Sequence, residues 1–184
     1  MVPVIKSYNK EIFLSMKEIR EIISNIKNAR DNLIFRVLYE TGCLPNELVN
    51  IKIKDILGNK IRLNNRFVLI SGKLAKDLSL FIEGNKLAKE DFLFFSRQGK
   101  NISEKRVNQI IRYYTKDYDS NFNPIKLRYY HVLHAYLNGV FIENIAKNLD
   151  LSEFRVFQIL QNFKFSANKF QIGNYHNFLK RVGL

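Results

Sequence analysis

The sequence predicts a mainly α-helical domain with a small antiparallel β-sheet, an α+β fold. Apolar residues recur at helical spacing before residue 50 and again after residue 103. Between these parts, residues 51–82 contain short β-branched and aromatic runs separated by turn dipeptides. The chain has 184 residues, of which 46% are hydrophobic, including 15 Phe and 9 Tyr. This composition suits one folded domain with a buried core and excludes a disordered chain.

The N-terminal part is expected to contain three helices. Ser15 begins the first helix, and Glu18, three residues later, completes a capping-box pattern. The predicted buried face of this helix consists of Met16, Ile19, Ile22, Ile23 and Ile26. Asp31 opens the second helix, which stops at Gly42, and Pro45 suits the first turn of the third.

The middle part is expected to form the sheet. Its candidate strands are residues 51–56, 59–63, 66–70 and 78–82. The dipeptides between them are turn signals, namely Gly58-Asn59, Asn64-Asn65 and Ser71-Gly72. The sequence therefore predicts an antiparallel sheet with a tight Asn-Asn hairpin. A short apolar run at 91–95 and a polar turn at 96–100 follow.

The C-terminal part is helical again. Ser103 caps a helix over residues 104–114, whose inward residues are Val107, Ile110, Ile111 and Tyr114. Three further helices are expected over 124–137, 141–149 and 152–162. The predicted domain thus spans residues 14–162. Residues 1–13 form an N-terminal arm, and residues 163–184 form an aromatic-rich tail that either packs on its own domain or exchanges between subunits.

The charge of the chain indicates its partner. Thirty Lys and Arg against seventeen Asp and Glu give a net charge of +13. A strong basic excess on a folded domain favours a polyanion, and double-stranded DNA is the predicted partner. The alternative is a generally basic protein from an AT-rich genome. A single cysteine, Cys43, allows no intrachain disulfide, and no apolar run reaches bilayer length. A cytoplasmic, DNA-associated protein without a membrane partner or cofactor is expected.

Three segments resemble tyrosine recombinases, the phage integrase family, in the same order along the chain. Residues 31–56 (DNLIFRVLYETGCLPNELVNIKIKDI) are similar to a block of that family with a Thr-Gly pair, a Glu-Leu pair and an Asp-Ile pair. Residues 91–111 (DFLFFSRQGKNISEKRVNQII) are similar to its segment before the active-site helix. Residues 126–139 (KLRYYHVLHAYLNG) are similar to the active-site helix itself. The resemblance implies the recombinase catalytic-domain fold.

That family cleaves DNA with a defined set of side chains. Two arginines clamp the scissile phosphate, a lysine and a histidine assist proton transfer, and a tyrosine attacks phosphorus. Carried over residue by residue, the second arginine is Arg128. The other positions hold, in chain order, Leu44, the Asn64-Asn65 turn, Ile125, Tyr129, Leu151 and Leu160. The resemblance therefore implies a degenerate catalytic site, with Arg128 as its vestige and no catalytic residue expected.

Two features leave alternatives open. Tyr175 lies far enough along the chain to act as a displaced nucleophile, although a tyrosine in an aromatic tail is more often a packing anchor. His131 and His134 have a spacing that metals can use, but no cysteine or acidic cluster accompanies them. We expect both histidines to be structural and no metal site to form.

Basic residues concentrate in segments that the family uses to face DNA. The candidate DNA contacts are Arg66, Arg97, Lys100, Lys105, Arg106, Arg112, Lys116, Lys126 and Arg128. Each cation that neutralises a phosphate releases counterions, so binding should weaken steeply with salt. The alternative is an ordinary solvated helix face.

Three functions are consistent with these residues. The first is a non-catalytic DNA-binding protein derived from a tyrosine recombinase, with an accessory, regulatory or architectural role. The second is an active recombinase whose nucleophile is Tyr175 or comes from a partner. The third is a protein-interaction module that regulates a recombinase through self-association or exchange of residues 163–184.

Overall fold

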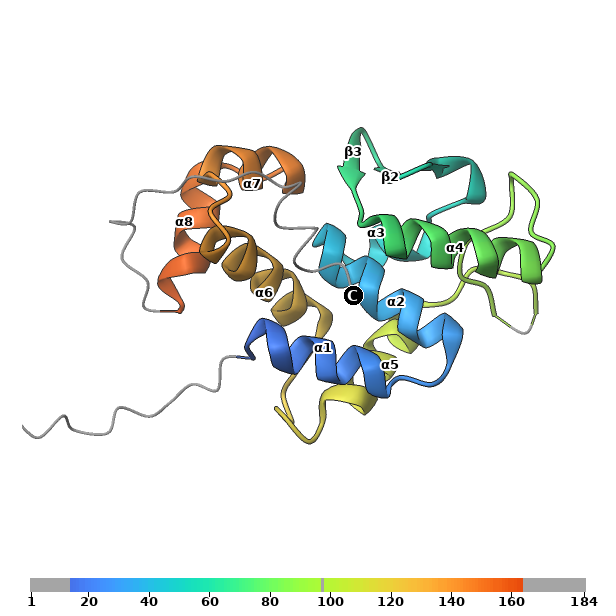
Figure 1. Cartoon of the computed structure of the whole chain (residues 1–184), viewed down its shortest axis with the longest axis horizontal. Coiled ribbons are helices and arrows are strands. Elements are labelled where there is room, and N and C mark those ends of the chain that lie inside the picture. The colour runs from blue at the N-terminus through green and yellow to red at the C-terminus, as the bar shows by residue number, and fades with distance from the viewer. Residues whose placement is uncertain (1–13, 97, 164–184) are drawn as a thin grey trace, which may run out of the picture.

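The computed structural model describes residues 14–96 and 98–163. The predicted arm, Arg97 and residues 164–184, with Tyr175, lie outside the described residues. The helices are α1 (Met16–Asn25), α2 (Ala29–Thr41), α3 (Pro45–Val49), α4 (Gly72–Gly84), α5 (Glu104–Thr115), α6 (Pro124–Leu137), α7 (Ile142–Leu149) and α8 (Glu153–Gln161). The strands are β1 (Ile56–Leu57), β2 (Lys60–Leu63) and β3 (Arg66–Leu69). A mainly helical fold with a small antiparallel sheet, as predicted, is confirmed (Figure 1).

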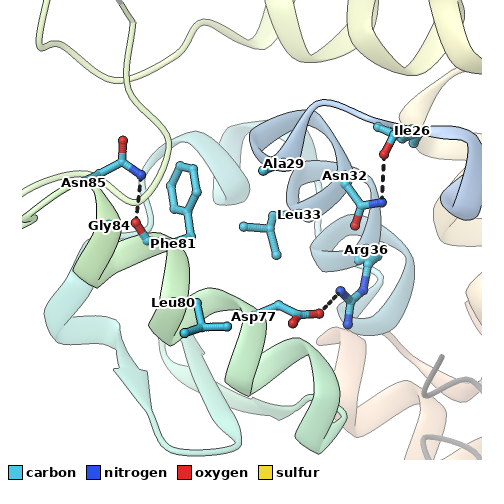
Figure 2. A pocket seen from close by; sticks show the side chains of 10 residues that line it. All are labelled: Ile26, Ala29, Asn32, Leu33, Arg36, Asp77, Leu80, Phe81, Gly84 and Asn85. Atoms are coloured by element: carbon cyan, nitrogen blue, oxygen red, sulfur yellow. Dashed lines mark hydrogen bonds and ion pairs between the residues drawn. The ribbon is translucent and has the colours of Figure 1, made fainter.

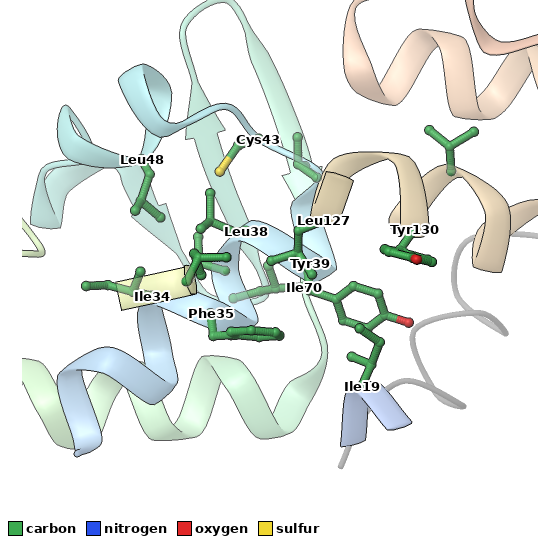
Figure 3. Packing of buried hydrophobic residues seen from close by; sticks show 14 of the residues in the cluster. Ile19, Ile34, Phe35, Leu38, Tyr39, Cys43, Leu48, Ile70, Leu127 and Tyr130 are labelled. Carbon is green, nitrogen blue, oxygen red and sulfur yellow. The ribbon is translucent and has the colours of Figure 1, made fainter. Parts of the chain in front are cut away.

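Helix α2 is the element around which the others pack. It contacts α1, α3, α4, α5 and α6, and Figure 1 shows it between the sheet with α4 on one side and α6 on the other. Its residues Ile34, Phe35 and Leu38 are fully buried and meet side chains from α1, α3 and α6 (Figure 3). Fully burying an aliphatic or aromatic side chain of this size contributes about 1.5–3 kcal/mol, so the core forms around this helix.

The helix ends follow the sequence signals closely. Ser15 caps α1 with a complete capping box to Glu18, and Ser103 caps α5 through the amide of Arg106. The second helix begins two residues earlier than predicted, because the Asn28 side chain accepts from the Asp31 amide and serves as its cap. These caps satisfy amides that have no partner within the helix.

The predicted hairpin is present, with the register set by a two-residue turn. β1, β2 and β3 pair in sequence order, all antiparallel, and Leu63 pairs with Arg66 across Asn64-Asn65. Asn64 has φ of 51°, a left-handed conformation that asparagine tolerates better than most residues. Ile61 and Val68 point inward and are fully buried, which fixes which face of the hairpin packs on the core.

The prediction of a strand at residues 78–82 is wrong, because this segment lies inside α4. Ser71 is the helix cap rather than a turn residue: its hydroxyl accepts from the Leu74 amide. Leu74 and Leu78 are fully buried and lie four residues apart, on one helical face. The local β-preference of the run Leu-Ser-Leu-Phe-Ile is thus overridden by a capped helix that buries that face.

The predicted strand at residues 51–56 is also shorter than expected. Only Ile56 joins the sheet, as part of β1, and residues Ile53–Asp55 form a 3-10 turn. The Asp55 carboxylate accepts from the Lys52 amide and closes this turn. The run at 91–95 forms two isolated bridges, between Lys52 and Phe92 and between Phe95 and Asn101, instead of a strand.

Polar contacts attach α4 to α2. Arg36 donates to Asp77 at one end of an open groove of about 500 Å³, whose apolar lining includes Leu33 and Phe81 (Figure 2). Deeper in the structure, Glu40 accepts from both the amide and the hydroxyl of Ser71. Burial raises the pKa of Glu40, and the Ser71 hydrogen bonds oppose that rise.

Gly42 lies between α2 and α3, where a larger residue would collide with neighbouring side chains unless they moved. It has φ of 63°, and a Cβ there would lie 2.6 Å from Leu149 Cδ2 and 2.9 Å from His131 Cδ2. Gly42→Ala should therefore lower the free energy of unfolding by about 2–4 kcal/mol, through left-handed backbone strain and overpacking. Urea unfolding measures this. Gly58→Ala is the matched control: Gly58 has φ of 60°, and apart from its chain neighbours no described atom lies within 4 Å of the added Cβ, so this variant should show the backbone cost alone. Equal losses in both variants would contradict the predicted clash.

Within the described residues, no helix has the length and apolar character needed to cross a bilayer.

Candidate nucleic-acid interface and buried arginine cluster

Arg128, the arginine singled out in the sequence, is buried near the start of α6. It retains 6% exposure. Its Nη1 donates to the carbonyl of Gly42 at 3.0 Å, and its Nη2 donates to the carbonyl of Leu149 at 3.0 Å. The side chain therefore ties α6 to the end of α2 and to the last turn of α7. Two of its donors are used on the protein's own backbone.

Glu47 is the anion beside Arg128. Its Oε2 lies 3.8 Å from Arg128 Nη1 and accepts from the Leu44 amide at 2.8 Å. Its Oε1 accepts from Arg66 Nη1 at 2.6 Å and from Asn64 Nδ2 at 3.3 Å. One carboxylate therefore joins α3, the β2–β3 hairpin and α6. We call Glu47, Arg66 and Arg128 the arginine cluster.

Arg66 connects the hairpin to α7. Besides its ion pair with Glu47, its Nε donates to the carbonyl of Asn148 at 3.1 Å. The carbonyls of Asn148 and Leu149 lie at the C-terminal end of α7, where the helix dipole is negative and cations are favoured. The two arginines of the cluster thus cap this helix end. The sequence by itself predicts Arg66 only as a contact for DNA.

The charges of the cluster influence one another's protonation. Burial alone would raise the pKa of Glu47, but the hydrogen bonds from Arg66 and the Leu44 amide hold that pKa below its ordinary value. Burial lowers the pKa of Arg128, and Glu47 opposes this effect. Glu47 is therefore a carboxylate at neutral pH, and it is the negative charge that makes burial of two guanidinium groups tolerable.

The two histidines of α6 hold the core together, as the sequence suggested. His134 Nε2 donates to the carbonyl of Leu14 at 3.0 Å, so its Nδ1 is the acceptor for the Tyr39 hydroxyl at 2.7 Å. His131 Nδ1 donates to the Tyr39 carbonyl at 2.8 Å. Among the described residues, no three His, Cys, Asp or Glu are grouped so that they could hold a metal ion.

Both histidines should make stability depend on pH. Burial lowers the pKa of His131 to about 3 and that of His134 to about 4. Because the unfolded chain protonates them near pH 6.5, stability is complete above that pH and is lost as the pH falls toward the folded pKa values. Urea unfolding should show a loss of about 1.5–2 kcal/mol for each histidine between pH 6.5 and pH 5. His134→Gln should lose about half of this pH dependence; an unchanged dependence would contradict the assignment.

Exposed cations follow one side of α5. Lys105, Arg106, Arg112 and Lys116 are all exposed. Arg106 Nη1 contacts Gln109 Oε1 at 3.4 Å, and Lys116 Nζ lies 5.4 Å from the centre of the Tyr113 ring, which is 64% exposed. These four residues, which we call the α5 cations, form no ion pair with a described carboxylate. They present a positive surface with an aromatic side chain beside it.

The other predicted DNA contacts differ in their surroundings. Lys100 is exposed, in the turn before α5. Lys126 at the start of α6 pairs with Asp119 at 2.6 Å while its side chain stays 40% exposed. Arg97 lies outside the described residues. The structure therefore brings the α5 cations together on one helix, whereas Arg66 and Arg128 lie together in the separate arginine cluster.

Comparison with known proteins gives the family of the chain. A family model described as the phage integrase family matches residues 13–159. The chain belongs to the phage integrase family. Among curated proteins, the tyrosine recombinase XerA of Pyrococcus horikoshii is 28% identical over 157 residues, which is 79% of this chain and 55% of XerA. The tyrosine recombinase XerC of Staphylococcus aureus strain JH9 is 29% identical over 154 residues, 77% of this chain and 51% of XerC. The chain thus spans about half the length of these relatives.

Solved structures show the same fold. A crystal structure of XerA recombinase aligns with a TM-score of 0.73 at 22% identity, covering 88% of this chain and 65% of that one. XerH site-specific recombinase bound to its difH substrate aligns with a TM-score of 0.68 at 19% identity, covering 83% of this chain and 52% of that one. The expected recombinase catalytic-domain fold is confirmed.

The structure also shows where the residues lie that the sequence resemblance aligned with catalytic positions. Leu160, which the resemblance aligned with the tyrosine nucleophile, is 2% exposed in α8. Leu44, which the resemblance aligned with the first arginine, is half-buried at the start of α3. Tyr129 and Leu151 are half-buried and Ile125 is 49% exposed. The Asn64-Asn65 turn lies beside Glu47 through the Asn64 hydrogen bond.

Sequence reasoning missed two residues of this region. Glu47 belongs to the Glu-Leu pair of the family resemblance, from which no role for its side chain follows, and no motif of the sequence includes Asn148. The Glu47 signal was available: an acidic residue in the run Leu-Pro-Asn-Glu-Leu-Val, between residues that pack, must find a buried cation. Asn148 gives no such signal, because its contact with Arg66 spans 82 residues.

Proposed function

We propose that this member of the phage integrase family is a DNA-binding protein that performs no strand transfer of its own. The observation that carries the proposal is that some of its cations are exposed, whereas Arg128 is hydrogen-bonded within the protein. The α5 cations are exposed and free of carboxylate partners among the described residues. Arg128, the retained catalytic-type arginine, donates instead to two backbone carbonyls.

The α5 cations suit a phosphate backbone. Lysine and arginine side chains on one helical surface can reach successive phosphates, and each contact releases counterions. XerH, which shares this fold, was solved bound to its difH substrate. Lys100 and Lys126 extend the positive surface at either side of α5 along the chain. The biological role that follows is accessory, regulatory or architectural.

The absence of strand transfer rests on chemistry. Covalent catalysis of this kind needs a hydroxyl nucleophile, and a leucine such as Leu160 has none. A phosphate clamp needs free guanidinium donors, and two donors of Arg128 are already hydrogen-bonded within the protein. If Arg128 released these two hydrogen bonds to bind a phosphate, the carbonyls of Gly42 and Leu149 would lose their donors.

The test uses duplexes carrying a nick that traps covalent recombinase intermediates, with binding measured in the same samples at rising salt. We expect salt-sensitive binding and no covalent adduct, and a recombinase that forms the adduct serves as the positive control. An adduct would overturn the proposal and favour an active recombinase. Its loss in Tyr175→Phe would then identify a displaced nucleophile. No binding at low salt would favour the third function, a protein-interaction regulator.

A further inference from the structure

Two donors on contacting residues, one of them a member of the arginine cluster, lack partners in the described part of the chain. Among the described residues, Arg66 Nη2 and Asn148 Nδ2 are buried atoms without a hydrogen bond. They belong to residues that already touch, since Arg66 Nε donates to the Asn148 carbonyl at 3.1 Å. An unpaired buried donor is destabilising, so two of them on contacting residues favour a ligand that accepts from both.

The charge around these donors favours an anion. The arginine cluster contains two guanidinium groups and a single carboxylate, so it carries an excess positive charge. The Glu47 carboxylate is already shared among the Leu44 amide, Asn64 and Arg66. A cation would meet only donors here, whereas an oxyanion would gain two hydrogen bonds, one of them charge-assisted.

The two side chains lie at the edge of the core: that of Arg66 retains 14% exposure, and Asn148 is half-buried. The donor atoms themselves have almost no exposed surface, so an oxyanion reaches them through a movement of these two side chains. A comparable pair of unpaired donors occurs on Arg36. That side chain, however, lies between Asp77 and Glu40, where two carboxylates oppose an anion. The donors beside Asn148 are therefore the better site.

We propose that Arg66 Nη2 and Asn148 Nδ2 together bind an oxyanion, and that in the cell this is a phosphate of the DNA backbone. This site differs from a clamp made by Arg128, because Arg128 keeps its bonds to Gly42 and Leu149. The assignment of the ligand to DNA rests on the proposed function. Binding of a phosphate oxyanion as such does not, so the two can fail separately.

The first arm of the test measures thermal unfolding of the full chain with inorganic phosphate or chloride at equal ionic strength. Phosphate several-fold above its dissociation constant should raise the unfolding midpoint by about 2–4 °C relative to chloride. Asn148→Leu should abolish the rise. It should still fold, because the substitution removes an unsatisfied buried donor and keeps the backbone carbonyl that Arg66 binds. Asn144→Leu, at an exposed position of the same helix, is the matched control and should keep the rise.

A second variant keeps the test decisive if Asn148→Leu does not fold. Asn148→Asp places a carboxylate beside Arg66 in place of the bound oxyanion, so it should fold and should show no phosphate-specific rise. No rise in the wild type, or equal rises in all four proteins, would overturn the oxyanion site.

The second arm distinguishes the source of the phosphate. Asn148→Leu should weaken binding of a DNA duplex roughly three- to tenfold, as expected for loss of one contact, while Asn144→Leu should leave it unchanged. Unchanged DNA affinity in Asn148→Leu, with the phosphate-specific rise lost, would overturn the assignment to DNA in favour of free phosphate. Failure of the wild type to bind DNA at all would refute the proposed function, and the first arm would still decide the oxyanion site.

Discussion

Glu47→Gln should lower the free energy of unfolding by about 3–5 kcal/mol. Glu47 is 8% exposed and is the carboxylate shared by Arg66 and Arg128, whose side chains are themselves 14% and 7% exposed. Glutamine keeps the size of the side chain and can accept from the Leu44 amide, but it carries no charge. The substitution therefore leaves two largely buried guanidinium groups without a counter-charge, and removing one partner of a buried ion pair is strongly destabilising.

Urea unfolding at pH 7 measures this loss of stability. Comparison with two further variants shows whether the loss comes from the unpaired buried charge. Arg62→Gln, which removes an exposed partner of Asp55, is the control for an ordinary surface ion pair and should cost no more than about 1 kcal/mol. Replacing the whole cluster with Glu47→Leu, Arg66→Met and Arg128→Met should recover part of the Glu47→Gln loss, because no unpaired charge remains. A Glu47→Gln loss below that of Arg62→Gln would mean that water solvates the cluster.

Neutralising the α5 cations should have the largest effect on DNA binding. The triple variant Lys105→Gln, Arg112→Gln and Lys116→Gln should lower affinity roughly a hundredfold at moderate salt, if each side chain contributes about 0.9 kcal/mol. The slope of log affinity against log salt should decrease in magnitude by about 2.7, because each lost phosphate contact removes about 0.9. These residues are exposed and have no described carboxylate partner, so stability should change little.

A charge-matched control separates local contact from overall charge. Lys76→Gln, Lys86→Gln and Lys89→Gln remove the same three charges from exposed positions in and after α4. This variant should keep most of the wild-type affinity and slope in a fluorescence anisotropy titration with a labelled duplex. Equal losses in the two triple variants would show that the duplex responds to net charge and not to α5.

The sequence alone determined the local elements and the family. Ser15, Ser103 and the Asn64-Asn65 turn act within three or four residues, so their helix caps and hairpin could be predicted from spacing. The three segments that resemble tyrosine recombinases, in the right order, were enough to predict the catalytic-domain fold. The net charge of +13 predicts DNA as the partner, and this partner is part of the proposed function.

The secondary structure predicted from local sequence was wrong where tertiary packing decides between a strand and a helix. Residues 78–82 have the composition of a strand, yet they belong to α4, because the Ser71 cap and the buried Leu74 and Leu78 place them on a helix against the core. The sequence offers both a strand pattern and a capped helix at this point. Only burial against the rest of the domain decides between them.

The use of each cation was likewise decided by tertiary structure. Arg128, Arg66 and Lys105 are equivalent in the sequence as basic residues of DNA-facing segments. Folding brings Arg128 to the carbonyl of Gly42, 86 residues away, and Arg66 to the carbonyl of Asn148, 82 residues away. Lys105 stays exposed on α5. No pattern within one helix or strand encodes contacts over such separations, since they depend on where the last turn of α7 lies against α2, α6 and the hairpin.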